Sequence, residues 1–165
     1  GLSAAAKAAL GERVDTADWP RFELPANHPR FAEVSGEAVW RREVALPAEW
    51  VGEFATLHIP GIKSFDTVTV NGVVVGSTSK DTDPKNPNPW NTPRAYRIMP
   101  GVLRAGVNVI AIRQFVPDKD GGVHGRPDRF YLQLLVPEDR KLNAYVDNWN
   151  DDPKYGDDPY RYYRW

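Results

Sequence analysis

The residues best suited to binding a ligand lie in two polar loops of the chain. Trp90 stands in the first loop, residues 77–93, and the amide Asn91 follows it directly. An exposed indole can stack on the apolar face of a sugar ring while neighbouring amides bond its hydroxyl groups, and sugar sites need this mixture of flat apolar surface and convergent polar groups. The alternative is that Trp90 closes one end of the folded domain, and the sequence leaves both interpretations open.

A polar cluster lies in the second loop, residues 118–127, and just after it. His124 stands in a glycine-rich stretch, and Arg126 and Asp128 follow within four residues. We predict that this loop lies near Trp90 and that the three polar side chains belong to the same ligand site. A plain surface role for His124 is the alternative. Trp149, in the acidic and aromatic tail, is a further candidate, although such a tail can also dock on the domain or on a neighbour.

Loop aspartates carry the hard oxygen ligands that Ca²⁺ prefers. The candidates are Asp118 with Asp120 and Asp128, or Asp81 with Asp83. Neither spacing fits the twelve-residue calcium loop, because Gly121 comes too early after Asp118 and no closing Glu follows at the required place. We therefore predict no cofactor and keep Asp118 and Asp120 only as candidates for a structural calcium ion.

The chain offers few groups for catalysis. It has three histidines and no cysteine, and it lacks the nucleophile elbow Gly-x-Ser-x-Gly, the zinc motif His-Glu-x-x-His and a phosphate-binding glycine loop. Two carboxylates at a suitable separation are sufficient for glycoside hydrolysis. The sequence therefore predicts no catalytic residue, and a hydrolase remains the least favoured alternative.

Composition limits the class of protein and of partner. A chain of 165 residues fits one domain with a single core. Its net charge is −1, with 21 basic and 22 acidic residues, which removes the electrostatic attraction to nucleic acid or anionic membrane. The longest apolar stretches have the length of strands, so we expect no membrane span.

The elements that position these loops are mostly strands. Ser3 is a good cap for a short helix over residues 4–10, and Gly11 is a typical stop. Residues 14–29 form an irregular arm, which we expect Trp19 and Phe22 to pin to the domain. Alternating or strongly apolar runs predict strands at residues 38–46, 54–59, 65–70, 73–75, 94–99, 108–115 and 130–136. Asn71 and Gly72 predict a tight hairpin, because both tolerate positive φ.

Two residues of the first predicted strand have consequences for the core. Trp40 is expected to fill the core with its N–H bonded to the backbone. Arg42 shares that face and needs a buried carboxylate if it points inward, for which Asp66 is the candidate. Together the strands predict an all-β, antiparallel jelly-roll sandwich with one short N-terminal helix.

An ordered series of segments resembles a known family. Residues 36–47, 61–62 and 66–76 resemble the sugar-binding domain of glycoside hydrolase family 2. Residues 90–98, 103–113 and 121–125 are most similar to the version in sialate O-acetylesterase-type proteins. The resemblance implies a galactose-binding-like jelly roll and a role beside a catalytic domain. The chain departs from the family at Arg41 and His124, where aromatic residues are common.

From these observations we predict a jelly-roll domain over residues 1–136, followed by a tail over residues 137–165 that packs on the domain or on a partner. The predicted function is a non-catalytic carbohydrate-binding module of a carbohydrate-active hydrolase. Its expected partners are an oligo- or polysaccharide and the neighbouring catalytic domain, in an extracytoplasmic location. A purely structural domain that supports a catalytic neighbour is the main alternative.

Overall fold

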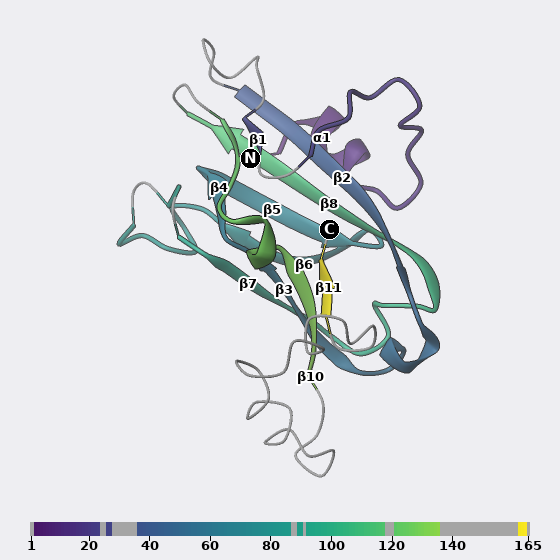
Figure 1. The fold of residues 1–165 in the computed structure, drawn as a ribbon. Coiled ribbons are helices and arrows are strands. Elements are labelled where there is room, and N and C mark those ends of the chain that lie inside the picture. The colour runs from purple at the N-terminus through teal and green to yellow at the C-terminus, as the bar shows by residue number, and fades with distance from the viewer. Residues whose placement is uncertain are drawn as a thin grey trace.

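The computed structural model describes residues 2–23, 26–27, 36–86, 89–90, 92–117, 121–135 and 162–164. Within these ranges the chain forms two four-stranded antiparallel sheets, a small three-stranded sheet and a short helix (Figure 1). The predicted all-β antiparallel sandwich with an N-terminal helix is confirmed. No helix in the described part of the chain is long and apolar enough to cross a membrane.

The first sheet has the strand order β2-β8-β5-β6. Its strands are β2 (Gly36–Leu46), β8 (Gly106–Val116), β5 (Phe65–Val70) and β6 (Val73–Thr78). The two long strands run past the predicted bounds, because their ladder continues from the pair Gly36 and Val116 to the pair Leu46 and Gly106. Alternation predicted the centre of each strand, and the pairing partner sets its ends.

The second sheet has the strand order β11-β10-β3-β7. Its strands are β11 (Tyr162–Arg164), β10 (Tyr131–Leu135), β3 (Phe54–Ile59) and β7 (Arg94–Ile98). In β3, Ala55, Leu57 and Ile59 are fully buried, as the alternation predicted. The backbone of β11 belongs to the tail and pairs antiparallel with β10.

The third sheet lies within segments for which the sequence predicts no strand. It joins β1 (Ala26–Asn27), β9 (Gly122–His124) and β4 (Gly61–Lys63). Strands of two or three residues are too short to show a periodicity, so only their long-range pairing reveals them. Two short 3₁₀ turns, at Ala48–Trp50 and Pro127–Arg129, complete the elements of the described ranges.

The core fills the space between the two large sheets. Its largest fully buried apolar side chains are Trp50, Leu57, Ile59, Ile62, Val68, Val70, Ile98, Ile110, Ile112, Val116 and Phe130. Each such side chain contributes about 1.5–3 kcal/mol relative to an exposed one. Burial of these side chains holds the sandwich together and leaves the loops at its two ends.

Trp40 and Arg42 differ from the expectations for them. Trp40 does pack against the core, but its Nε1 donates to the side-chain Oε1 of Gln114 at 2.9 Å and not to backbone. Arg42 is exposed, and the predicted pairing with Asp66 is wrong, because Arg94 occupies that carboxylate. The alternation places Arg42 on the same face of β2 as Trp40. However, β2 lies at the edge of its sheet, where a long side chain can reach solvent.

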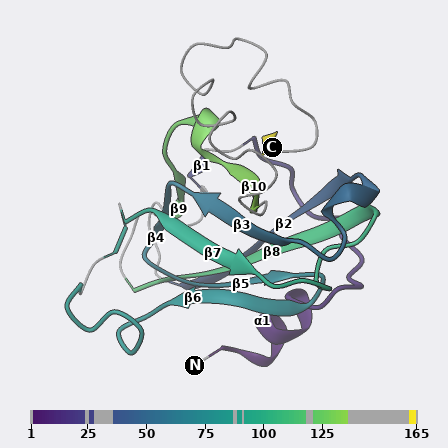
Figure 2. The same cartoon turned by 90° about the horizontal axis from the view of Figure 1, so that it is seen from below.

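The helix α1 (Ala4–Ala9) packs on the outer side of the first sheet, as Figure 2 shows. The Ser3 hydroxyl caps it by accepting from the Ala6 N–H at 3.0 Å. Arg41 donates to the carbonyls of Ala9 and Gly11 at 2.8 and 2.6 Å and to that of Glu12 at 3.0 Å. This arginine holds the end of a helix too short to be stable alone.

The predicted hairpin at Asn71 and Gly72 is confirmed. Both residues have positive φ, 50° and 79°, which matches the twist of the flanking strands. The Asn71 side chain also accepts from the Val109 N–H and donates to the Val102 carbonyl and to Asn108 Oδ1, each at 2.8 Å. The turn therefore anchors a neighbouring loop as well as reversing the chain.

Two substitutions at Asn71 separate these roles. We expect Asn71→Gly, which keeps the turn conformation, to lower the free energy of unfolding by about 1–3 kcal/mol, because buried partners lose their hydrogen bonds. Asn71→Ala should cost more, since it adds the strain of positive φ. Urea unfolding measures both. Equal stability of Asn71→Gly and the wild type would contradict the anchoring role.

Candidate functional site

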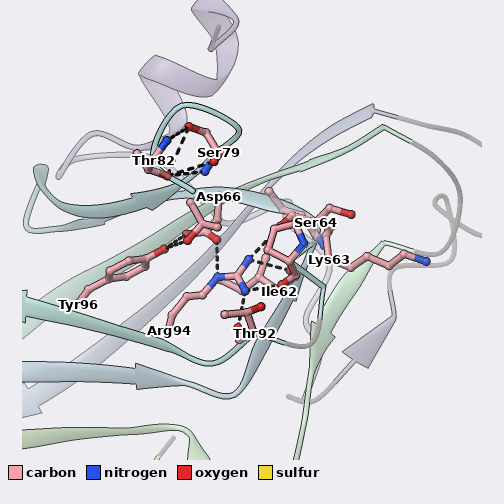
Figure 3. Close-up of polar contacts among 12 residues, drawn as sticks. Ile62, Lys63, Ser64, Asp66, Ser79, Thr82, Thr92, Arg94 and Tyr96 are labelled. Atoms are coloured by element: carbon pink, nitrogen blue, oxygen red, sulfur yellow. Dashed lines mark hydrogen bonds and ion pairs between the residues drawn. The ribbon is translucent and has the colours of Figure 1, made fainter. Parts of the chain in front are cut away.

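The loop end of the sandwich, where residues 61–64, 89–90 and 122–124 lie together, is organised around the buried side chain of Arg94 (Figure 3). A guanidinium has five N–H groups. All five donate, one to Asp66 Oδ2 at 2.7 Å and the others to the carbonyls of Ile62, Ser64, Pro89 and Thr92. A single side chain at the start of β7 therefore fixes the backbone of two loops.

The Asp66 carboxylate, which accepts from Arg94 through one oxygen, accepts from a phenol through the other. Tyr96 donates its hydroxyl to Asp66 Oδ1 at 2.5 Å and lies 2.7 Å from Thr78 Oγ1. Burial and the adjacent Asp66 carboxylate raise the pKa of the Tyr96 phenol far above its usual range, so the hydroxyl stays protonated as a donor. Gly76 leaves room for this ring, because a Cβ there would lie 2.1 Å from Tyr96 Cδ1.

Gln114, on β8, ties the loop end to the core. Its side chain is fully buried and donates from Nε2 to the carbonyls of Lys63 and Gly122, the latter at 2.7 Å. Its Oε1 accepts from Trp40. The small sheet of β4 and β9 is thus bonded to the main sheet through one amide side chain.

Trp90 and His124 meet at Gly61. A Cβ added to Gly61 would lie 3.0 Å from the Trp90 carbonyl oxygen and 3.7 Å from that of His124. The Trp90 side chain is 46% exposed, while the carbonyl of the preceding Pro89 is held by Arg94 at 2.6 Å. The loop end therefore presents an exposed indole on a backbone fixed from below, with the loop of His124 beside it.

His124 itself is partly buried. Its Nε2 atom is shielded from solvent and has no hydrogen-bond partner among the described residues. Burial, and then the positive charge of Lys63, lower the pKa of the imidazole below its usual range. The ring is therefore neutral at pH 7 and can accept or donate one hydrogen bond. Its loop needs Gly125, whose φ is 112° and whose Cβ would lie 2.4 Å from Pro60.

Arg126 and Asp128 bind each other. The two guanidinium contacts to the carboxylate measure 3.1 and 2.9 Å, and the Arg126 side chain is 74% exposed. Exposed pairs contribute little stability, but this one gives the loop of His124 a paired charged group at its surface. Both residues remain candidates for a polar contact at the rim.

Other predicted site residues lie outside the described residues. These are Asn91, Trp149 and the calcium candidates Asp118 and Asp120. In the part of the chain that the structure describes, no three His, Asp or Glu side chains gather in a way that could hold a metal ion. Asp81 and Asp83 are described and belong to no such group.

The sequence analysis missed the two residues that build the loop end, Arg94 and Gln114. Both are buried polar side chains in strands whose inward positions are mostly apolar. A polar side chain at such a position needs partners, and that signal was available in the sequence. The partners themselves are carbonyls of distant loops, which no local pattern specifies.

Comparison with solved structures reveals similar domains. A Bacteroides uniformis beta-glucuronidase aligns over 76% of this chain and 15% of its own, at 20% identity and a TM-score of 0.59. A calcium-binding mutant of Bacteroides uniformis beta-glucuronidase 2 aligns over 76% of this chain and 16% of its own, at 20% identity and a TM-score of 0.58. The chain thus spans about a sixth of these enzymes, and at this identity the likeness establishes the fold alone.

Sequence comparisons add nothing further to the fold. No protein-family profile matches the sequence, and no curated protein is detectably similar to it.

We expect Arg94→Met to be strongly destabilising. It leaves the Asp66 carboxylate buried without its cation, which typically costs about 3–5 kcal/mol. Chemical unfolding measures the loss, and Arg97→Met, an exposed position on the same strand, is the matched control. A similar small loss in both variants would contradict the anchoring role of Arg94.

The buried imidazole predicts a pH dependence of stability. Because the folded pKa of His124 lies below that of the unfolded chain, about 6.5, the unfolded state binds the proton first as the pH falls. The contribution of His124 to stability is complete above the unfolded-state pKa, and it is lost progressively as the pH falls below that value.

Urea midpoints between pH 8 and pH 5 measure this effect. As the pH falls, we expect the urea midpoint to decrease less steeply in His124→Gln than in the wild type. His58→Gln is the parallel variant, because burial also lowers the pKa of that imidazole. An unchanged slope in His124→Gln would show that the ring is solvated in the folded state.

Proposed function

We propose that this chain is a non-catalytic accessory module of a glycoside hydrolase and that it binds carbohydrate at the loop end. The observation that carries the proposal is the exposed Trp90 indole on a backbone fixed by Arg94, with His124 beside it. A rigid aromatic surface with polar neighbours suits a sugar ring, because its position costs no further ordering on binding.

The fold supports the proposal that this chain is one module of a larger glycoside hydrolase. The similar chains carry the name beta-glucuronidase, and the aligned domain is about a sixth of each. Together with the sequence resemblance to glycoside hydrolase family 2, this favours a module attached to a larger enzyme. We further propose a neighbouring catalytic domain as its partner and an extracytoplasmic location. The narrower resemblance to sialate O-acetylesterase-type proteins stays a prediction.

A purely structural role has one observation in its favour. Several exposed apolar side chains stand near the strand ends that lie away from Trp90, namely Val51, Phe54, Val73, Val74, Met99 and Val107. Exposed apolar surface often marks a protein contact. A surface containing them would dock on a catalytic neighbour and leave the loop end free, so both roles can coexist in one chain.

Calorimetric titration tests the binding role. We expect weak binding of one or more oligosaccharides to the wild type, since a shallow surface desolvates few hydroxyl groups. Trp90→Ala should weaken it at least about tenfold, the effect of losing roughly 1.4 kcal/mol. Its free energy of unfolding should change little, because the indole is exposed.

Three results would argue otherwise. A large loss of stability in Trp90→Ala would identify the indole as a plug of the sandwich. Failure of every sugar to bind a folded wild type would leave only the structural role. Turnover of nitrophenyl glycosides by the isolated chain would overturn the non-catalytic assignment.

A further inference from the structure

A groove lined by aromatic and charged side chains lies away from the loop end. This groove of about 1200 Å³ separates the N-terminal arm, residues 12–22, from residues 38–43 of β2. We call it the arm groove. Because β2 is the edge strand of its sheet, residues from both of its faces reach the groove. Figure 1 shows the arm as a dark loop beside β2. Small-ligand sites measure about 300–1,000 Å³, so the arm groove has room for several sugar rings.

Aromatic rings give the arm groove flat apolar surface. Trp40 forms part of its floor, and the Phe22 ring meets it edge to face, with centroids 5.6 Å apart and an interplanar angle of 65°. Phe22 is 37% exposed, and Trp19 is partly exposed. Aromatic surface that stays open to solvent inside a groove is available to a ligand with an apolar face.

The polar lining is balanced in charge. Four arginines and four carboxylates line the arm groove. The arginines are Arg13, Arg21, Arg41 and Arg42, and the carboxylates are Glu12, Asp15, Asp18 and Glu43. Arg41 holds the end of α1, Glu12 pairs with Arg104, and Asp15 accepts from the Ala17 N–H at 3.0 Å. Such a lining attracts neither polyanions nor polycations, but it supplies both donors and acceptors, which hydroxyl groups require.

We propose that the arm groove binds a neutral oligosaccharide, with Trp19 and Phe22 in contact with sugar faces. The inference rests on the proposed function only for the class of ligand. The site is separate from the loop end, because neither Trp90 nor His124 lines the groove.

Trp40 is not the residue to mutate. Its N–H bonds Gln114, which in turn holds the carbonyls of Lys63 and Gly122 at the loop end. Loss of Trp40 would therefore disturb both surfaces. Trp19 and Phe22 belong to the arm, outside the two large sheets, so their removal should leave the sandwich folded.

The experiment titrates neutral cello-, manno-, xylo- and galacto-oligosaccharides into the wild type, Trp19→Ala, Phe22→Ala and Trp90→Ala. Phe54→Ala is the matched control, because Phe54 is 39% exposed and lies away from both surfaces. We expect affinity for the bound sugar to fall about tenfold in each arm variant and to stay unchanged in Phe54→Ala. Indole N–H signals in NMR spectra of the sugar-bound wild type should shift at Trp19.

The outcomes distinguish the two surfaces. Binding that survives in both arm variants and is lost in Trp90→Ala overturns the arm groove and supports the proposed function. Binding lost in the arm variants and kept in Trp90→Ala supports the arm groove and removes Trp90 as the contact. Binding of oligogalacturonate or of an extended peptide in place of neutral sugars overturns the ligand class. A folded wild type that binds no probe overturns both carbohydrate sites.

Discussion

The ion pair of Arg94 and Asp66 is the interaction on which the loop end depends. Both side chains are almost completely buried, and ions lose several kcal/mol of hydration on burial, so the arrangement is stable only if every donor is satisfied. That requirement is met by the carbonyls of two loops. The buried charge of Arg94 therefore holds irregular backbone in one conformation. The exposed Trp90 is positioned by this constraint, because Arg94 bonds the carbonyl of the preceding Pro89.

The same principle recurs elsewhere in the sandwich. Gln114 joins the small sheet to the core, Arg41 holds the end of α1, and Asn71 ties the hairpin to its neighbouring loop. In each case one polar side chain satisfies groups that strands and helices leave unpaired. The apolar core gives the two layers, and these few polar side chains arrange what lies at their ends.

The fold and the function rest on different kinds of support. A likeness to beta-glucuronidase domains at 20% identity establishes an architecture, and the same architecture can host unrelated activities. The features that favour sugar binding are side chains: an indole held on rigid backbone at one surface, and aromatic rings with balanced charges at another. The two surfaces share a physical link, since Gln114 bonds both Trp40 and the loop end.

The sequence by itself determined the sandwich, because strand alternation and turn chemistry are local. The buried face of Ala55, Leu57 and Ile59 and the turn at Asn71 could be read from neighbouring residues. Tertiary structure alone decided that Asp66 pairs with Arg94 and not with Arg42, and that residues 61–63 and 122–124 form a sheet. Those outcomes depend on which distant groups meet in space, and residue spacing carries no information about that.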